Sequence, residues 1–324
     1  MIVLMPLKPA LRSHSVSAAA AQLVAARFTP AASPPLPLSG CSLAISVMTA
    51  LIKVDGRHAN WAHPLGVMVF LFTAVIGTTI AAHDYLVTHS SLYGPSSGLE
   101  LGAPNLNFSP TLAYGFIIYV VLMVLCRYAD CGSYIFYETA WCCNSSLIMA
   151  GIGILTHRPL LVGASIAGVC CDQLLWYIDC VGYALTGKFK IGVAKYLAWP
   201  ETSWSKRYLC AHHLWFMPAA LWALGWHLPA HSFLLSCLFT SVSTGLSRYV
   251  TPKTWKDVFG GHEHYMNVNA GHEFWKDAAR GTFFHSFNDS PGYIYLPFMM
   301  LVANCLLNGP PYLLISAVMA TMHK

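Results

Sequence analysis

Five polar side chains stand out in residues 170–215, where two apolar stretches flank a basic loop. Asp172, Gln173 and Asp179 lie in the first stretch, and the pair His212-His213 opens the second. Charged side chains inside a bilayer are costly, so they normally face the interior of a helix bundle and have a partner. Because Asp172 and Asp179 are seven residues apart, a helix places both on one face, two turns apart. A carboxylate beside an imidazole is an arrangement suited to general acid–base catalysis.

Further carboxylates and imidazoles fall on the same predicted side of the membrane. Glu138 and Asn144 open another apolar stretch from that side, and the long loop 249–292 contains a set of His and Glu residues. These are His262, His264, His272 and Glu273. The Tyr, Phe and Trp residues between them indicate that the loop packs onto the helices. We therefore expect a site rich in His, Asp and Glu at the cytosolic end of a helix bundle.

The chemistry that this site favours is acyl transfer or ester hydrolysis, with a histidine as general base. The catalytic candidates are Asp179, His212, His213, His272 and Glu273, with Asp179 or Glu273 orienting the base. The residues expected to bind substrate are Asp172, Gln173, Glu138, Asn144, Lys188, Lys190 and Lys195. The three lysines can attract the anionic head group of a lipid, or they serve only to fix the orientation of their loop. The expected partner is a membrane lipid or another hydrophobic or amphipathic small molecule.

Metal-assisted chemistry is a second possibility, because His and carboxylate side chains commonly bind zinc or non-haem iron. The metal candidates are His262 and His264, and His212 and His272 are further possible ligands of a divalent cation. The spacing does not favour a di-iron centre of the membrane desaturase kind. The only HxxxH pattern, His227 to His231, is interrupted by Pro229 and lies on the opposite predicted face.

An Asp near the end of one span followed by a His-His pair at the start of the next resembles the TLC-domain membrane proteins of lipid metabolism. The resemblance covers only Asp179 and His212-His213 in their context, so no site residue is carried over from that family. Two other functions stay open. Asp172, Asp179 and Glu138 suit an ion or proton path in a transporter, although no internal repeat is visible. The chain can also be a membrane subunit without chemistry of its own.

The composition indicates a protein solvated by lipid. Of 324 residues, 56% are hydrophobic and only 10% are charged. The net charge of +5 comes from loops beside apolar stretches and accompanies no recognition motif, which argues against nucleic acid as a partner. Most of the eleven cysteines lie in or beside apolar segments, and we expect them to be buried free thiols.

Apolar stretches of membrane-spanning length predict an all-α, polytopic transmembrane bundle of about seven spans, with a range of six to eight. We place the spans at about 65–83, 111–127, 138–156, 159–185, 208–228, 230–248 and 293–316. The sequence Asn308-Gly309-Pro310-Pro311 interrupts the last stretch, which is then either one kinked span or a span plus a re-entrant piece. The predicted organisation is an extension over 1–54, a six-span membrane domain over 55–248, the His-rich loop 249–292 and a final span over 293–324.

The distribution of Lys and Arg predicts the orientation of the chain. Lys53 and Arg57 precede the first span, and the basic loop 186–207 contains five cations against Glu201. With seven spans, the positive-inside rule puts the N-terminus and the loops 128–137, 186–207 and 249–292 on the cytosolic face. The glycosylation pattern Asn107-Phe108-Ser109 then falls in a non-cytosolic loop, which suits an endomembrane of the ER type.

The N-terminal extension points to a different membrane. Residues 1–54 contain Lys and Arg but no Asp or Glu and are rich in Ala and Ser, as is typical of an organelle transit peptide. The alternative is a translation start at Met48, followed by a short cytosolic leader. We thus expect an integral membrane protein located in an endomembrane or an organellar membrane.

Overall fold

The computed structural model describes residues 63–89, 106–200, 202–229, 231–256, 263–275 and 283–322. The chain divides into two units, Met1–Ala50 and Leu51–Lys324, and all described residues belong to the second. The N-terminal extension and His262 lie outside the described residues.

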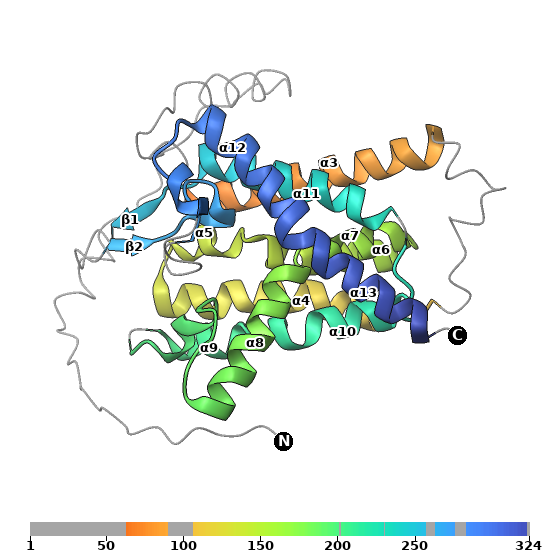
Figure 1. The fold of residues 1–324 in the computed structure, drawn as a ribbon, viewed down its shortest axis with the longest axis horizontal. Coiled ribbons are helices and arrows are strands. Elements are labelled where there is room, and N and C mark those ends of the chain that lie inside the picture. The colour runs from red at the N-terminus through yellow and green to blue at the C-terminus, as the bar shows by residue number, and fades with distance from the viewer. Residues whose placement is uncertain are drawn as a thin grey trace, which may run out of the picture. The chain divides into compact units, whose positions relative to one another are not determined.

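The second unit is an all-α bundle to which one short β-hairpin is added (Figure 1). Its α-helices are α3 (Pro64–His89), α4 (Pro110–Cys131), α5 (Ile135–Thr139), α6 (Cys142–Leu155), α7 (Pro159–Ala167), α8 (Cys170–Thr186), α9 (Trp204–Leu209), α10 (His212–Ala223), α11 (Ser232–Val250), α12 (Gly292–Leu301) and α13 (Gly309–Met322). The shorter elements are the 3-10 helices η2 (Lys195–Ala198), η3 (Val268–Ala270) and η4 (Phe283–Phe287), the π-helix η5 (Val302–Asn308), and the strands β1 (Thr254–Lys256) and β2 (Glu263–Tyr265).

Among the described residues, three helices are long and apolar enough to cross a membrane: α3, α4 and the continuous helix Gly292–Met322. A fourth is added if α7 and α8, which meet at a 50° bend, form one span. The structure therefore confirms the all-α class and the membrane-length helices. The count of seven spans and the orientation of the N-terminus stay predictions.

Three of the predicted spans are not among these membrane-length helices. The stretch 138–156 is divided between α5 and α6, and 208–228 holds only the end of α9 and the 12-residue α10. The stretch 230–248 matches the 19-residue α11, whose buried face is lined with hydroxyl side chains. These are Ser232, Ser236, Thr240, Ser243 and Ser247. Such small polar residues permit close helix packing but lower the hydropathy of a span.

The last span is one continuous helix, not a helix followed by a re-entrant piece. Pro310 and Pro311 lack the N–H groups that an α-helix would bond to the preceding turn. The π-helix η5 directly before them widens the turn there, so that the chain continues into α13 without a break. Asn304 of η5 stabilises this region by accepting a hydrogen bond from Thr240 of α11.

The core lies between α4, α6, α7, α10 and α13, where large apolar side chains such as Phe116, Leu147, Ile166 and Phe216 are fully buried. Two smaller apolar clusters fix the loops at one end of the bundle. In one of them Tyr137 and Met266 pack against the first turns of α3, and in the other Phe274 packs against α12. The prediction that loop 249–292 packs onto the helices is thus confirmed for its described residues.

Candidate functional site

The first turns of three helices meet inside the bundle. Cys143 is the second residue of α6, Asp172 is the third of α8, and His212 and His213 are the first two of α10. Each of the three helices begins directly after a short non-helical interruption: Ala140-Trp141, Gly168-Val169 and Cys210-Ala211. In each case the break places a polar side chain on the first turn of the following helix.

Cys143, His212 and His213 form the centre of the site. The thiol sulfur and one nitrogen of each ring all lie within 4.8 Å of one another. His212 is 2% exposed and His213 is 7% exposed, whereas Cys143 is half-buried. Asp172 lies beside them, with its Oδ2 3.2 Å from Nδ1 of His213. Although that separation is close enough for an ion pair, the two groups are not aligned as a hydrogen bond.

The two imidazoles are held by ring contacts and by one backbone hydrogen bond. Nδ1 of His212 lies 3.0 Å from the carbonyl oxygen of Leu209, which favours a proton on that nitrogen. His213 stacks on Trp176 with ring centres 5.5 Å apart, and the two histidine rings are 4.3 Å apart. Tyr119 meets His212 edge-on. Among the described residues, the buried Nε2 of His212 has no hydrogen-bond partner.

More buried polar atoms occur on the same helices as these four residues. Gln173, which follows Asp172, is fully buried, and within the described part of the chain neither atom of its amide has a hydrogen-bond partner. The same holds for Oδ1 of Asn144, although its Nδ2 donates to the carbonyl of Thr139. Buried polar groups are usually paired, so unpaired ones beside a His/Cys cluster indicate room for a ligand.

Asp179 does not meet the histidines. Its carboxylate accepts hydrogen bonds from the backbone N–H groups of Ile191, Gly192 and Ala194 at 2.6 to 3.1 Å. Asp179 is fully buried and closes the loop that follows α8, where Gly187 ends the helix with a φ of 66°. Of the two aspartates on this helix, the structure thus pairs Asp172 with His213 and Asp179 with the loop.

Glu138 lies in an ion-pair network outside the cluster. It binds the guanidinium of Arg127 and, at 2.9 Å, the ammonium of Lys206. Burial alone would disfavour the charged form of this carboxylate, but the two cations outweigh that effect. Glu138 is therefore ionised at neutral pH, and it links α4, α5 and α9 instead of lining a cavity with Asp172.

The described His and Glu candidates of the His-rich loop have partners away from the cluster of Cys143, His212 and His213. His264 stacks on Tyr134, and Nε2 of His272 donates to the carbonyl of Thr251 at 2.8 Å. Glu273 lies 2.6 Å from the ammonium of Lys253. These side chains form no metal cluster within the described ranges; the His262 candidate cannot be placed, because it lies outside them.

Asn269 is the loop residue that reaches the site. Its Oδ1 accepts a hydrogen bond from the backbone N–H of Cys142, next to Cys143. Its Nδ2 donates to the carbonyl of Ala140 and to the hydroxyls of Ser243 and Ser247 on α11. The loop thereby supports the first turn of α6.

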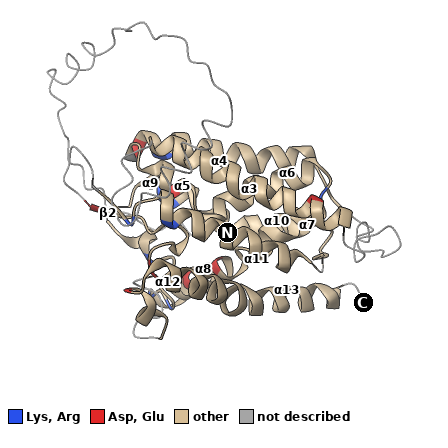
Figure 2. Ribbon diagram, turned by 90° about the horizontal axis from the view of Figure 1, so that it is seen from above, with Lys and Arg blue, Asp and Glu red and all other residues tan. Residues whose placement is uncertain are grey.

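The candidate lysines Lys188, Lys190 and Lys195 are exposed on the loop after α8 and on η2. Figure 2 shows charged residues concentrated at the end of the bundle that contains α5, α9 and β2, with a smaller group beside α7. The group beside α7 includes the ion pair between Arg158 and Asp84. The lysines are thus accessible but do not belong to the buried cluster.

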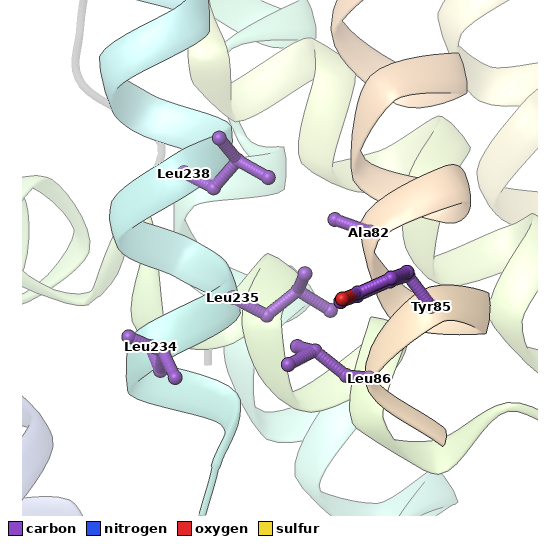
Figure 3. Close-up of a pocket in the computed structure, with 6 residues that line it drawn as sticks. All are labelled: Ala82, Tyr85, Leu86, Leu234, Leu235 and Leu238. Carbon is purple, nitrogen blue, oxygen red and sulfur yellow. The ribbon is translucent and has the colours of Figure 1, made fainter. Parts of the chain in front are cut away.

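A shallow hollow of about 290 Å³ lies between the C-terminal half of α3 and the first half of α11 (Figure 3). Its lining consists of apolar side chains and one tyrosine: Ala82, Tyr85, Leu86, Leu234, Leu235 and Leu238. None of the candidate site residues lines it. We assign the chemistry to the His/Cys/Asp cluster, because the hollow offers no titratable group apart from a phenol.

Sequence reasoning missed Cys143, because a cysteine in an apolar stretch behaves as a small hydrophobe in most proteins. The available signal was its place directly before Asn144 and the two serines that follow, at the polar start of a helix. The described cysteines are free thiols, as predicted, but the predicted burial holds only for Cys170 and Cys210, because Cys126 and Cys305 are exposed and the others are half-buried.

The fold and the cluster together define a helical protein with membrane-length helices and a site in which two buried imidazoles meet a half-buried thiol and a partly exposed carboxylate. Comparison of the chain with known protein families, curated proteins and solved structures gives no match. The function has to be inferred from the site itself.

Proposed function

We propose that this protein is an integral membrane enzyme that cleaves or transfers the acyl group of a lipid-like substrate. The observation that carries the proposal is the Asp172–His213 pair, 3.2 Å apart, beside His212 and Cys143 in a bundle with membrane-length helices. A carboxylate beside a buried imidazole, with a second buried imidazole and a thiol next to it, is unusual as a purely structural arrangement in a largely apolar bundle.

Asp172 prepares His213 for chemistry. With the carboxylate at Nδ1, the proton of a neutral imidazole is favoured on that nitrogen, and Nε2 keeps its lone pair. Such a lone pair activates a nucleophile either by accepting its proton or by binding an ion that acidifies it. Both routes deliver an activated nucleophile to a substrate carbonyl.

The convergence of three helix N-termini supports the same reaction. Cys143, Asp172 and His213 lie on the first turns of α6, α8 and α10, where the helix dipoles place partial positive charge. Negative charge develops on the carbonyl oxygen when an acyl group is attacked, and oriented N-terminal dipoles stabilise it.

The substrate class is inferred from the surroundings of the cluster. The side chain of Asp172 is 43% exposed, so the site opens to the surface of the bundle at α8. Ile178 and Val181 on the same helix are also exposed and apolar, which suits contact with an acyl chain. The exposed Lys188, Lys190 and Lys195 at the end of the same helix suit an anionic head group.

We also propose the seven-span topology with a cytosolic N-terminus and the division at 55–248, 249–292 and 293–324. It is supported by the contacts between the loops expected in the cytosol. Glu138 binds Lys206, and Tyr134 stacks on His264, so described parts of all three loops lie at one end of the bundle. This is the arrangement that alternating spans would produce.

The test of the activity is a comparison of variants of the full chain in vesicles, offered a panel of lipids with ester-, thioester- or amide-linked acyl groups. Product formation is followed by mass spectrometry. For His213→Ala we expect a loss of turnover of about 100-fold or more, and for Asp172→Asn a loss of about 10- to 100-fold. His83→Gln is the matched control, because His83 is also a buried histidine with a neighbouring carboxylate, Asp84, but lies on α3.

Equal turnover in wild-type protein and both site variants would contradict the proposal, as would the absence of any acyl product from the whole panel. Flux of an ion through the protein in sealed vesicles, abolished by Asp172→Asn and without acyl chemistry, would replace the enzyme with a transporter. Stable copurification with a partner, without either activity, would indicate a membrane subunit.

A further inference from the structure

We propose that Cys143, His212 and His213 bind one transition-metal ion of the zinc class. The donor atoms of the three side chains already lie within 4.8 Å of one another. Zinc binds sulfur at about 2.3 Å and imidazole nitrogen at about 2.0 Å, so donor atoms around a tetrahedral ion are separated by roughly 3.5 Å. The donor atoms, which are at most 4.8 Å apart, need to approach one another by no more than about 1.3 Å to reach that separation.

The surroundings of both imidazoles match those of metal-binding histidines, which usually pair their second nitrogen with a carbonyl or a carboxylate. Nδ1 of His212 faces the carbonyl of Leu209, and its buried Nε2 has no hydrogen-bond partner among the described residues. Nδ1 of His213 faces Asp172, which leaves Nε2 of that ring for the ion. Asp172 lies outside the group of three and supports His213 from beside it.

The charges balance. A divalent cation in an apolar interior is stable only if anions compensate it. The thiolate of Cys143 and the carboxylate of Asp172 supply two negative charges against two positive ones. Cys143 loses its proton when it binds the ion, as metal-ligating thiols do.

The set of donors selects the kind of ion. One thiolate and two imidazoles suit zinc better than magnesium or calcium, which prefer oxygen ligands. Three protein ligands leave a fourth position for water or a substrate oxygen, as in catalytic zinc sites. The binding of the ion is independent of the proposed enzymatic function, whereas its role in activating a nucleophile depends on that function.

The test is the metal content of the full chain, purified in detergent without chelators or affinity tags that bind metals. We expect about one zinc ion per chain in the wild type. Cys143→Ser and His212→Gln should lose most of it, and Asp172→Asn should weaken zinc affinity about 10- to 100-fold. Cys142→Ser and His83→Gln are the controls. Cys142 is the adjacent thiol but hydrogen-bonds to Ser243, and both controls should retain the ion.

A second readout does not depend on expression yield. Cobalt substituted for zinc should give a thiolate-to-metal charge-transfer absorption that is present in the Cys142→Ser protein and absent in folded Cys143→Ser protein. Wild-type protein without bound zinc that also fails to take up added zinc or cobalt would overturn the inference. So would zinc that stays bound in the Cys143→Ser and His212→Gln variants. If zinc binds as expected but no acyl substrate reacts, only the proposed enzymatic function fails; if acyl chemistry proceeds in a chain that takes up neither zinc nor cobalt, only the metal site fails.

Discussion

At the scale of single residues, burial and pairing separate side chains that look alike in the sequence. Asp172 and Asp179 share a helix, but one faces His213 while the other bonds the backbone of residues 191–194. His213 and His272 are both histidines beside an acidic residue. His213 belongs to a buried cluster, whereas His272 donates to a carbonyl in the loop. Residue type therefore identifies candidates for the site, and the contacts of each side chain in the fold show which of them belong to it.

His272 gives the protein a stability that depends on pH. Burial lowers the pKa of His272 from 6.5 to about 4, and the nearby cations Arg248 and Lys253 act in the same direction. Between these two values the unfolded chain binds more protons than the folded protein, so the free energy of unfolding decreases as the pH falls from about 6.5 to about 4. The slope is at most about 1.4 kcal/mol per pH unit for this one group.

The measurement is the thermal unfolding of the detergent-solubilised protein at pH 7.5 and pH 5. The His272→Gln variant keeps a donor for the carbonyl of Thr251 but cannot take up a proton. We expect it to lose less stability than the wild type between the two pH values. His264→Gln, in the same loop, is the control. Identical pH dependence in wild type and His272→Gln would show that His272 does not contribute.

At the scale of elements, the site exists because several helices are short. The long helices α3 and α4 are unbroken over 26 and 22 residues, while the first turns of α6, α8 and α10 carry the buried residues Asn144, Cys170 and His212. A helix that begins inside an apolar interior exposes backbone N–H groups that require partners. Asn269 supplies one at Cys142, and Asn308 accepts a hydrogen bond from the N–H of Cys171. Two asparagines thus stabilise the interior starts of α6 and α8.

The position of α6 against α4 depends on Gly151. A Cβ atom added at Gly151 would lie 2.9 Å from both the carbonyl oxygen of Ala113 and Cγ1 of Ile117 on α4. Gly151→Ala must therefore separate the two helices, and we expect a destabilisation of about 1–3 kcal/mol. Because α6 carries Cys143, zinc retention should decrease as well.

Gly115→Ala is the matched control. Gly115 lies on α4, where an added Cβ meets nothing within 4 Å. There alanine should leave stability unchanged or raise it by up to about 1 kcal/mol, because it favours the helical backbone. Denaturant or thermal unfolding of both variants checks the difference, and equal destabilisation of the two would contradict the close contact at Gly151.

At the scale of the whole described unit, the two ends of the bundle differ. One end contains α5, α9, the hairpin and most of the charged residues, whereas the other contains Arg158 paired with Asp84 (Figures 1 and 2). At this second end Asn107 donates its side-chain amide to the carbonyl of Trp222. The asparagine of the glycosylation pattern is thus engaged in the fold, so the pattern alone is a poor guide to the location of the protein.

The difference between the ends predicts opposite accessibility across a membrane. In the proposed topology, epitope tags inserted after Gly187 and after His157 lie at helix ends on opposite faces of the membrane. In sealed vesicles, we expect antibody to reach the tag after Gly187 from the cytosolic face and the tag after His157 only after detergent is added. Equal accessibility of the two tags would contradict the topology.

Much of this architecture could be predicted from hydropathy alone. The predicted spans 65–83 and 111–127 lie within α3 and α4, because long apolar stretches leave a chain few alternatives in lipid. The broken helices could not be predicted so well, since the breaks at Trp141 and at Gly168-Val169 contain no proline and depend on tertiary contacts.

The site was predicted in part. The His212-His213 pair and a carboxylate from the preceding span were expected together, and the structure brings Asp172 to that place. Asp179 was favoured because loop charge places it nearer the predicted cytosolic rim. Its backbone partners, residues 191–194, have no recognisable sequence signal. Cys143 could be identified only after folding had brought α6 beside α10.

The helix Gly292–Met322 has a consequence for the membrane itself. Its 31 residues extend over about 46 Å, while the hydrocarbon layer of a bilayer is about 30 Å thick. This excess requires the helix to lean or to carry its first turns, with the exposed Tyr293, into the headgroup layer. The tilt of this helix therefore depends on bilayer thickness, and a thicker membrane reduces the mismatch. Asn308 of this helix accepts a hydrogen bond from the N–H of Cys171. A change in tilt is thereby coupled to the first turn of α8, which carries Asp172.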